Sequence, residues 1–208
     1  MTAKIDFKTA VDAYRARSGE FRLLEVPEHR YLMIDGHGDP NTAPAFAEAI
    51  ETLYPVAYTL KFASRKDLDR DYVVPPLEGL WWADDMAAFT SARDKDRWDW
   101  TLMLLVPDWI DGDRVETAIG AVRGKKSLAR LDDLRFEALA EGSVVQTLHV
   151  GSFDAEAEVL ARLHDEILPD RGLRPTGRHH EIYLSDFRRV APERRRTILR
   201  QPVTPLTR

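Results

Sequence analysis

Glu28-His-Arg-Tyr-Leu-Met-Ile-Asp-Gly-His-Gly38 and Glu141-Gly-Ser-Val-Val-Gln-Thr-Leu-His-Val-Gly151 are two stretches of the chain that follow one plan. Each stretch reads as a hairpin strand that ends in a glycine turn, and each leads into a helical pattern, over 43–54 and 155–168 respectively. Apolar strand patterns recur in the same order further along, at 79–82 and 101–106 in the first half and at 181–184 and 197–202 in the second. A duplicated unit of this kind places two similar sheets side by side with a cleft between them, and such clefts usually hold small molecules.

The length and composition are those of a globular protein. The 208 residues, 44% of them hydrophobic, suffice to bury a normal core in one compact domain or in two fused halves. We expect a single domain over 1–208 that consists of two repeats, at about 18–122 and 128–205, with an N-terminal helix at about 6–17. The segment 123–127 is the expected junction between the halves.

Composition disfavours several classes of protein. The longest apolar runs, such as 101–106, are far shorter than the roughly 18 residues that span a bilayer, and the first residues lack the hydrophobic core of a signal peptide. We therefore expect a cytoplasmic protein that spans no membrane. The absence of cysteine excludes disulfides, thiol catalysis and cysteine-ligated zinc. A formal net charge of -5 opposes unspecific binding to nucleic acid, which relies on lysine and arginine.

The first candidate for chemistry is the strand pattern Arg178-His-His-Glu-Ile-Tyr-Leu-Ser-Asp186. Alternation along a strand sends His179, Glu181 and Tyr183 to one face, which we expect to meet the cleft. The other face, with His180, is expected to pack on the helices. A partly desolvated carboxylate in the cleft can bind a cationic ligand or transfer a proton. The alternative interpretation is an ordinary salt-bridge or exposed carboxylate beside an ordinary half-buried strand tyrosine.

A second candidate is a set of aromatic side chains in the first half. Its members are Tyr58, Phe62, Tyr72, Trp81, Trp82, Trp98 and Trp100. Aromatic faces stack on flat ligands and attract cations, so this set predicts a pocket wall for a planar or positively charged organic molecule. Because Trp81 and Trp82 must face opposite ways, one of each adjacent pair is expected in the core. Each tryptophan alone is as compatible with packing as with ligand contact.

Gly79 is a further candidate because it stands at the repeat position equivalent to Glu181, whereas Glu78 points to the other face. A glycine opposite a glutamate leaves room for a ligand in one half while the other half supplies the charge. We therefore expect Gly79 and His179 to border a site for an asymmetric ligand.

Other kinds of chemistry are weakly represented in the sequence. His179 and His180 point to opposite faces and cannot chelate a metal together, and no His-Glu-x-x-His pattern is present, so we predict neither a metal site nor a cofactor. The turn at 36–40 lacks the lysine and the glycine spacing of a phosphate loop. The arginines within 188–200 are compatible with an anion site, but such a run is usually a solvated turn.

Three motifs are informative in combination: Pro-Leu-Glu-Gly-Leu-Trp-Trp at 76–82, Trp-Asp-Trp at 98–100 with Pro-Asp at 107–108, and His-His-Glu-Ile-Tyr-Leu-Ser-Asp at 179–186. Together they resemble the GyrI-like small-molecule-binding family over about 21–203. The resemblance implies an α+β fold of two strand-helix-strand-strand modules related by a pseudo-twofold axis, with antiparallel sheets flanking a central ligand groove. It also implies that Glu181 lies at the ligand pocket. Many relatives are fused to helix-turn-helix regulators, and because no such segment is recognisable here we do not expect direct transcriptional control.

Stand-alone relatives that carry the Leu-Glu-Gly-Leu-Trp-Trp signature, here at 77–82, include hydrolases that open the strained cyclopropane of DNA-alkylating natural products. The resemblance implies the same activity here. Water would add to the activated ring carbon with Glu181 as base or electrostatic anchor, and a phenol, Tyr72 or Tyr183, would hydrogen-bond the carbonyl that gains negative charge. The tryptophans would sandwich the flat substrate.

Two other functions remain open beside a cytosolic hydrolase that detoxifies cyclopropane-bearing genotoxins. One is a non-catalytic sink or sensor that binds hydrophobic or cationic compounds. The other, inhibition of a protein such as DNA gyrase, follows from the family name alone, and no residue pattern indicates a protein partner. Hydrolysis through a serine or cysteine nucleophile is less well supported, because the sequence has no Gly-x-Ser-x-Gly elbow and no cysteine.

Overall fold

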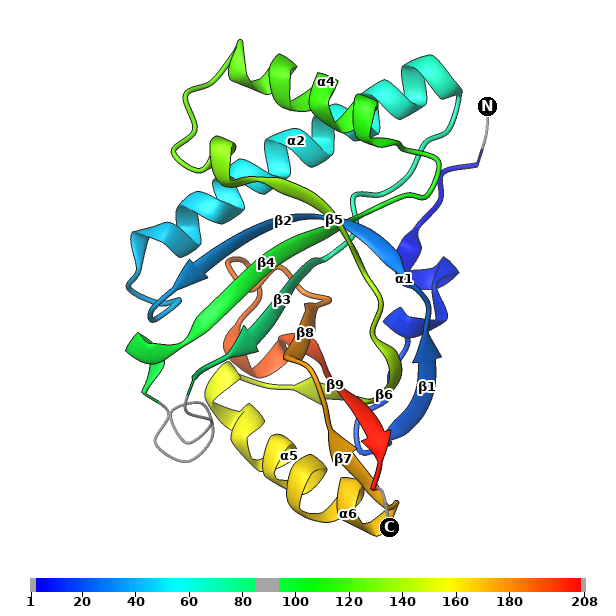
Figure 1. Cartoon of the computed structure of the whole chain (residues 1–208), viewed down its shortest axis with the longest axis vertical. Coiled ribbons are helices and arrows are strands. Elements are labelled where there is room, and N and C mark those ends of the chain that lie inside the picture. The colour runs from blue at the N-terminus through cyan, green and yellow to red at the C-terminus, as the bar shows by residue number, and fades with distance from the viewer. Residues whose placement is uncertain (1–2, 85–93, 207–208) are drawn as a thin grey trace.

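The computed structural model of the chain describes residues 3–84 and 94–206. It has an α+β fold built around one antiparallel sheet of nine strands, as Figure 1 shows. The strands lie in the order β1-β6-β9-β8-β3-β4-β2-β5, and β7 pairs with β9 outside this path. The predicted α+β class and antiparallel pairing are thereby confirmed. Among the described residues, no helix is both long enough and apolar enough to span a membrane.

The first half of the chain contributes strands to the sheet and helices that cover it. Its elements are β2 (His29–His37), α2 (Pro44–Leu68), β3 (Leu77–Trp82), η2 (Lys95–Arg97), β4 (Asp99–Val106) and α4 (Gly112–Arg123). Proline is tolerated in the first turn of α2, and this helix ends where Asp69 adopts a left-handed conformation. The Asp111 side chain caps α4 by accepting a hydrogen bond from the backbone N–H of Arg114. Local sequence chemistry therefore explains where both helices begin and where α2 ends.

The second half follows the same order of strand, helix, strand and strand. Its elements are β6 (Gly142–Val150), the consecutive helical segments η4 (Phe153–Ala155), α5 (Glu156–Arg162), η5 (Leu163–Ile167) and α6 (Leu168–Asp170), the short β7 (Leu173–Pro175), β8 (His179–Tyr183), η6 (Pro192–Arg194) and β9 (Arg196–Pro205). The outer strands are β1 (Arg22–Val26) and β5 (Arg135–Leu139), the latter preceded by η3 (Leu131–Asp133). Within the helical run, η5 is a π-helix, a wider turn that often occurs at functional sites.

The strand order is symmetric about the contact between β3 and β8. On one side of this contact lie β4 and β2, and on the other lie β9 and β6. The outermost strands are exchanged, because β1 pairs with β6 and β5 pairs with β2. Two modules related by a pseudo-twofold axis would give this order, and the duplication of the sequence itself stays a prediction. The halves form one continuous sheet, not the two separate sheets that we expected, because β3 and β8 exchange backbone hydrogen bonds.

The N-terminal segment differs from the single helix expected over 6–17. It forms α1 (Phe7–Ala10) and the 3-10 turn η1 (Asp12–Tyr14), which are separated by Val11 in an extended conformation. Two contacts hold the second turn in place, because Asp12 accepts a hydrogen bond from Arg22 and Tyr14 donates one to Glu78. Tertiary contacts with the sheet therefore override the local helical pattern.

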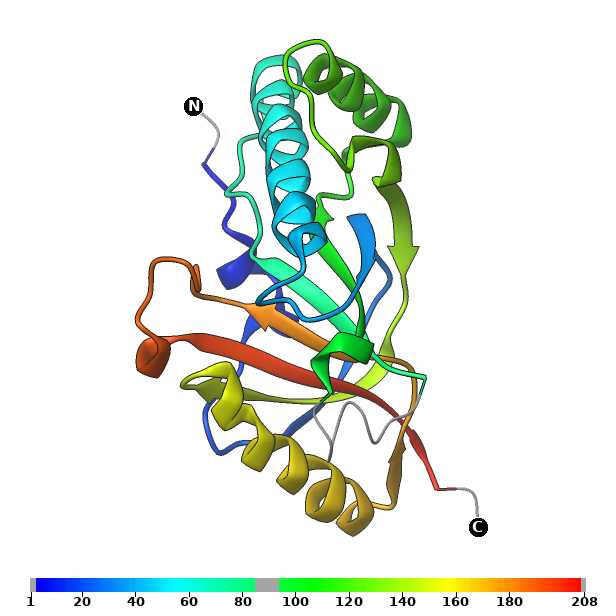
Figure 2. The same cartoon turned by 90° about the vertical axis from the view of Figure 1, so that its left-hand side faces the viewer.

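The longest helices lie at the two ends of the molecule. Figures 1 and 2 show α2 and α4 side by side at one end and α5 at the other. Beneath α2 the indole of Trp100 is fully buried and lies over Gly36, where an added Cβ would come within 2.0 Å of the ring. Phe46 of α2 packs edge-on against this indole, with 5.1 Å between the ring centroids. Gly36 is therefore needed for the close approach of Trp100 to β2.

The face of β8 opposite to Glu181 carries a buried cluster of charged side chains. His180 is fully buried, with Nε2 2.9 Å from Glu78 Oε2 and Nδ1 2.9 Å from Glu141 Oε1. Arg200 extends the cluster, with Nη1 2.6 Å from Glu141 Oε2 and Nη2 donating to the Ala13 carbonyl at 2.7 Å. We expected this face to pack on the helices, but it packs on the N-terminal segment. The reason is that buried polar groups need hydrogen-bonding partners, which the N-terminal segment supplies.

Mutual compensation keeps this cluster charged. Burial alone would raise the pKa of Glu141, but the positive charges of His180 and Arg200 lower it to about 2. Burial likewise opposes protonation of His180, yet Glu141 and Glu78 raise the pKa of its imidazole. Each buried ion therefore depends on its partners, and removal of one partner leaves another without compensation.

We expect Arg200→Met to lower the free energy of unfolding by about 3–5 kcal/mol, because it leaves the Glu141 carboxylate buried without its arginine. The exposed Arg196 on the same strand is the matched control, and Arg196→Met should change that free energy by about 0.5 kcal/mol or less. Urea denaturation at pH 7 measures both effects. Equal effects of the two substitutions would show that the buried cluster adds no stability.

Candidate functional site

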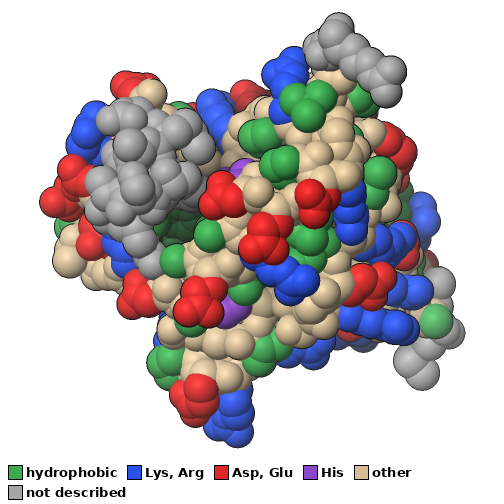
Figure 3. Space-filling view, turned by 90° about the horizontal axis from the view of Figure 1, so that it is seen from below, with side chains coloured by type: hydrophobic (Ala, Val, Ile, Leu, Met, Phe, Trp, Pro, Cys, Tyr) green, Lys and Arg blue, Asp and Glu red, His purple; other side chains and the backbone are tan. Residues whose placement is uncertain are grey.

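A cavity of about 860 Å³ lies between the η4–η5 helical run, the β3–β8 contact and the start of α2. Its aromatic walls are Phe46, Trp81, Trp98, Phe153, Tyr183 and Phe187. Its charged and polar lining includes Asn41, Lys95, Ser152, Asp154, Glu156, His164, Asp165, Glu181 and Arg195. Figure 3 shows acidic and hydrophobic side chains close together on the lower face of the molecule, where α5 lies. The cavity therefore combines flat apolar walls with several ionisable groups, as small-molecule sites usually do.

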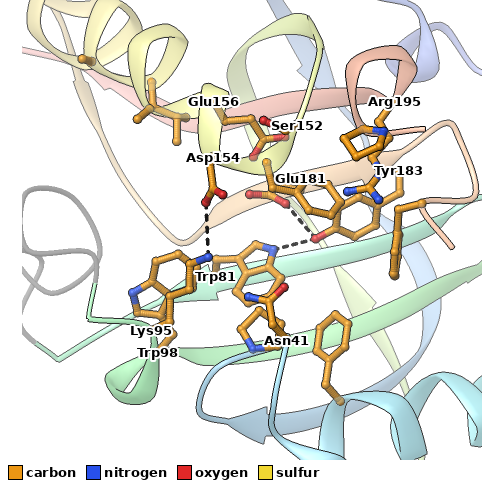
Figure 4. Close-up of a pocket in the computed structure, with 18 of the residues that line it drawn as sticks. Asn41, Trp81, Lys95, Trp98, Ser152, Asp154, Glu156, Glu181, Tyr183 and Arg195 are labelled. Atoms are coloured by element: carbon orange, nitrogen blue, oxygen red, sulfur yellow. Dashed lines mark hydrogen bonds and ion pairs between the residues drawn. The ribbon is translucent and has the colours of Figure 1, made fainter. Parts of the chain in front are cut away.

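A chain of hydrogen bonds crosses the sheet side of this cavity. The indole Nε1–H of Trp81 donates to the Tyr183 hydroxyl at 3.0 Å, and this hydroxyl donates to Oε2 of Glu181 at 2.8 Å, as Figure 4 shows. Burial and the nearby Glu181 carboxylate raise the pKa of Tyr183 well above its ordinary value. Tyr183 thus stays protonated, and its one hydroxyl hydrogen is already used in the hydrogen bond to Glu181. We call these three side chains the relay.

Strand pairing explains why the relay forms. In the antiparallel register of β3 and β8, Gly79 stands directly opposite Glu181, and Trp81 stands opposite His179. A Cβ on residue 79 would lie 2.8 Å from Trp81 Nε1 and 3.1 Å from the Tyr183 hydroxyl. The space above Gly79, which we expected a ligand to use, is therefore filled by the hydrogen bond between these two side chains.

Two histidines flank the helix side of the relay. His179 is buried with Nε2 3.6 Å from Glu181 Oε1, but it does not line the cavity. His164 lines the cavity from the π-helical η5. Burial, together with the nearby His179, lowers the pKa of His164 to about 4, so its imidazole is neutral at pH 7. A neutral imidazole next to the ligand space can accept or donate a hydrogen bond without a net charge.

The π-helix has a geometric consequence for the lining. The helical residues that line the cavity are Glu156, Ala157, Leu160, Ala161, His164 and Asp165, and they recur at intervals of four. In a regular α-helix with 3.6 residues per turn this row would drift around the axis. A π-helical turn contains more residues, so it keeps His164 and Asp165 on the side that faces the cavity.

Among the described residues, two cations line the cavity, and they interact with different kinds of partner. Lys95 Nζ is 3.4 Å from Asp154 Oδ1, an ion pair that links η2 to η4 across the space, as Figure 4 shows. Arg195 lies near Tyr183, with its guanidinium carbon 5.2 Å from the centroid of the Phe153 ring. The charge of Lys95 is therefore compensated by a carboxylate, whereas Arg195 is stacked on an aromatic face.

The structure brings together four of the residues that we predicted for the site and places the others elsewhere. The four that line the cavity are Glu181, Tyr183, Trp81 and Trp98. Of the remaining tryptophans, Trp82 faces the opposite side of β3, where the guanidinium carbon of Arg178 lies 3.5 Å from the centroid of its ring. Trp100 lies in the core, where it packs against Phe46. The strand alternation therefore separated Trp81 from Trp82, as expected.

The three aromatic side chains predicted upstream of β3 do not line the cavity. Tyr58 and Phe62 are 47% and 57% exposed on the outer side of α2, where their rings stack on each other. Tyr72 is buried near the N-terminal segment, against Phe7 and Trp109, with ring centroids about 6 Å apart. Tyr72 therefore cannot reach a substrate carbonyl in this cavity.

Several lining residues were not predicted from the sequence. Phe46, Phe153, Phe187, His164 and Arg195 come from helices and loops that only the fold brings next to β8. Trp98, a member of the aromatic set that we predicted as a pocket wall, does line the cavity, and it packs edge-on against Trp81 with 5.8 Å between the ring centroids. Amphipathic periodicity over 156–165 was the one available signal, since it marks a helix face without saying what that face covers. In the described residues, no group of three or more His, Asp or Glu side chains has the arrangement of a metal site.

Comparisons with known proteins agree with this architecture. The GyrI-like small molecule binding domain matches residues 19–203. The chain belongs to the GyrI-like small-molecule-binding family. A comparison with curated proteins gives no match.

Three crystal structures from Listeria innocua are similar to this GyrI-like protein over 97% of its length and 100% of theirs. One is an uncharacterized conserved protein, with 38% sequence identity and a TM-score of 0.88. The other two are described as hydrolases, with identities of 37% and 36% and TM-scores of 0.83 and 0.85. The family and the fold of this chain are thus established, and the aromatic cavity is its candidate small-molecule site.

We expect Gly79→Ala to disrupt the relay of this GyrI-like protein, because the new methyl group would meet the Trp81 indole and the Tyr183 hydroxyl. The free energy of unfolding should fall by about 1–3 kcal/mol, which urea denaturation measures. Gly120→Ala in α4 is the control, since no atom lies within 4 Å of its added Cβ, and it should stabilise the protein by about 0.4–1 kcal/mol. If both substitutions change the free energy of unfolding in the same direction and by the same amount, the crowding above Gly79 does not affect stability.

We also expect His164 to titrate at about pH 4, below the ordinary value of 6.5, because burial and the nearby His179 disfavour its charged form. The ring signals in a proton–carbon NMR titration measure this, with His164→Gln to assign them. A midpoint near 6.5 would show that the imidazole is solvated and does not face the enclosed part of the cavity.

Proposed function

We propose that this GyrI-like protein is a hydrolase that adds water to a flat, largely apolar small molecule held between the aromatic walls of the cavity. The observation that carries the proposal is the relay, which fixes a buried carboxylate, Glu181, at an apolar cavity through Tyr183 and Trp81. A carboxylate that is positioned by a neighbouring donor and shielded from bulk water is suited to remove a proton from a bound water molecule.

The substrate class that we propose is a cyclopropane whose ring is conjugated with a carbonyl group, as in strained genotoxic natural products. Water forms a bond to the ring carbon, and the broken ring bond sends its electron pair towards the carbonyl oxygen. Glu181 takes the proton that the water loses, and the product is a hydrate of the substrate. A cytoplasmic role in detoxification is part of this proposal.

Two further observations support hydrolysis. The Listeria innocua proteins described as hydrolases are similar to this chain over nearly the whole length of both, at 36% and 37% identity. In addition, Oε2 of Glu181 accepts a hydrogen bond from the Tyr183 hydroxyl, while its Oε1 lies 3.6 Å from His179 Nε2. Contacts on both oxygens hold the carboxylate plane in a defined orientation, which proton transfer requires.

A second candidate function is a non-catalytic sink or sensor for hydrophobic, planar or cationic compounds. The observation in its favour is the acidic lining: among the described residues of the chain, Asp154, Glu156, Asp165 and Glu181 outnumber the cations Lys95 and Arg195. Carboxylates near aromatic faces favour the binding of organic cations. Such a protein would bind its ligand and release it unchanged.

We expect Glu181→Gln to slow formation of the hydrate by about 10²–10⁴-fold, because the amide cannot accept the proton of water, whereas binding should change little since the amide keeps the shape of the side chain. The measurement is incubation of the purified chain with a cyclopropane-containing alkylator, with the ring-opened product followed by mass spectrometry. Glu158→Gln, at an exposed position of α5 outside the cavity lining, is the control.

Three other outcomes are informative. Turnover that survives Glu181→Gln unchanged would remove Glu181 from the mechanism. Stoichiometric protection of the alkylator without any product would favour the sink. Failure to bind the alkylator would reject both functions for this class of compound.

A further inference from the structure

Ring opening as proposed above leaves one requirement unmet. Negative charge gathers on the carbonyl oxygen of the substrate, and enzymes stabilise such charge with donors that are already in place. Tyr183 cannot serve in the observed arrangement, because its only proton is donated to Glu181. Tyr72 lies outside the cavity lining. The donor must therefore come from another residue of the cavity wall.

The arginine-rich stretch 188–200, which covers part of the loop between β8 and β9 and the first half of β9, supplies a candidate. The fold places its arginines in different environments. The Nε atoms of Arg188 and Arg189 lie 3.0 and 3.6 Å from carboxylate oxygens of Asp186, and Arg200 belongs to the buried cluster. Arg196 is exposed and lies in a separate groove on the other side of β9. Arg195 is the member of the segment that lines the aromatic cavity.

Arg195 is held in place without losing its capacity to bind an anionic oxygen. Its Nε donates to the Val190 carbonyl at 3.3 Å, and its guanidinium stacks against the Phe153 ring. Among the described residues, no carboxylate lies within ion-pair distance of it, whereas Lys95, the other cation of the cavity, is paired with Asp154. An arginine that is anchored through Nε presents the four N–H groups of its two terminal nitrogens to a ligand.

Arg195 and Glu181 line the same cavity and carry opposite charges. Figure 4 shows both side chains at the cavity, together with Tyr183. The two charges are not in contact, so a substrate can place its reacting carbon towards the carboxylate and its carbonyl oxygen towards the guanidinium. The charge separation that develops during ring opening would then run from a negative side chain towards a positive one, which stabilises it.

We propose that Arg195 binds the carbonyl oxygen of the substrate and stabilises the negative charge that forms there, which makes it a catalytic residue. The inference rests on the hydrolytic function proposed above and assigns the residue that recognises the carbonyl group of its substrates. In the step, a carbon–oxygen bond forms between water and the ring carbon, and one ring carbon–carbon bond breaks. The electron pair of that bond moves through the conjugated system to the carbonyl oxygen, which becomes an enolate oxygen bound to Arg195, or a phenolate where the carbonyl belongs to a cyclohexadienone. The proton of water passes to Glu181 and later neutralises the enolate or phenolate.

The test uses the full chain and a spirocyclopropyl cyclohexadienone, the simplest compound with this conjugation. Arg195→Gln should lower kcat by about 10²–10³-fold with a smaller change in KM, because the donor acts mainly on the transition state. Arg195→Lys should retain part of the activity, since it keeps the charge and loses the planar fork. Arg196→Gln is the matched control and should leave kcat unchanged. Circular dichroism and thermal unfolding of each variant exclude misfolding as the cause.

A second readout separates this inference from the proposed hydrolysis. In Glu181→Gln protein, where the probe stays intact, the carbonyl stretching band of a carbon-13-labelled probe should move to lower frequency on binding. The Glu181→Gln, Arg195→Gln double variant should lose this shift. Infrared difference spectra measure it, and a purely structural role for Arg195 would not change the band.

The outcomes are distinct. Loss of the shift together with loss of kcat supports the assignment of Arg195. Unchanged kcat and an unchanged band in the Arg195→Gln proteins overturn it while leaving the hydrolase intact. If wild-type protein binds the probe without forming the hydrate, the hydrolase is rejected and the carbonyl band alone decides whether Arg195 contacts this oxygen. A probe that binds neither protein overturns both proposals.

Discussion

The pairing of β3 with β8 is the contact on which the rest of the molecule depends. It joins the halves of the chain into one sheet, and its register puts Gly79 directly opposite Glu181. Because residue 79 has no side chain, the Trp81 indole and the Tyr183 hydroxyl can meet above it and form the relay. A shift of one residue in this register would send Glu181 to the opposite face and dissolve the site.

The same two strands also carry buried charges on their other face. On their other face Glu78 and His180 belong to a buried cluster that is stable only while every charge keeps its partner. That cluster ties β8 to the N-terminal segment and to β9, so the strand that presents Glu181 is fixed from behind. A catalytic or binding carboxylate gains from such rigid support, because small displacements weaken both binding and proton transfer. The charged face and the cavity face therefore act together, one holding the strand and the other using it.

The site could be predicted only where the sequence pattern is local, that is, where it relates residues close together in the chain. Strand alternation is local, and it correctly separated Trp81 from Trp82 and grouped Glu181 with Tyr183. Proximity in sequence to an aromatic strand was a poor guide. It assigned Tyr58, Phe62 and Tyr72 to the ligand site, whereas the structure puts them on an exposed helix face and in a cluster with the N-terminal segment. His164 carried no local signal, because a histidine on a helix is an ordinary surface residue until another element packs beside it. The run of arginines that contains Arg195 was compatible with an anion site, but the pattern did not distinguish Arg195 from its neighbours.

The sequence by itself determined the periodic features of this protein: the α+β class, most strands and helices, the faces of β3 and β8, and the resemblance to the GyrI-like family. These follow from repeating patterns in which each residue is read relative to its near neighbours. Only the tertiary structure decided that the halves share one sheet, that the N-terminal segment covers the charged face, and which helix and loop side chains close the cavity. Such contacts join residues far apart in the chain, and they are selected by the burial, hydrogen bonding and charge balance of the whole fold, for which a single sequence contains no short-range signal.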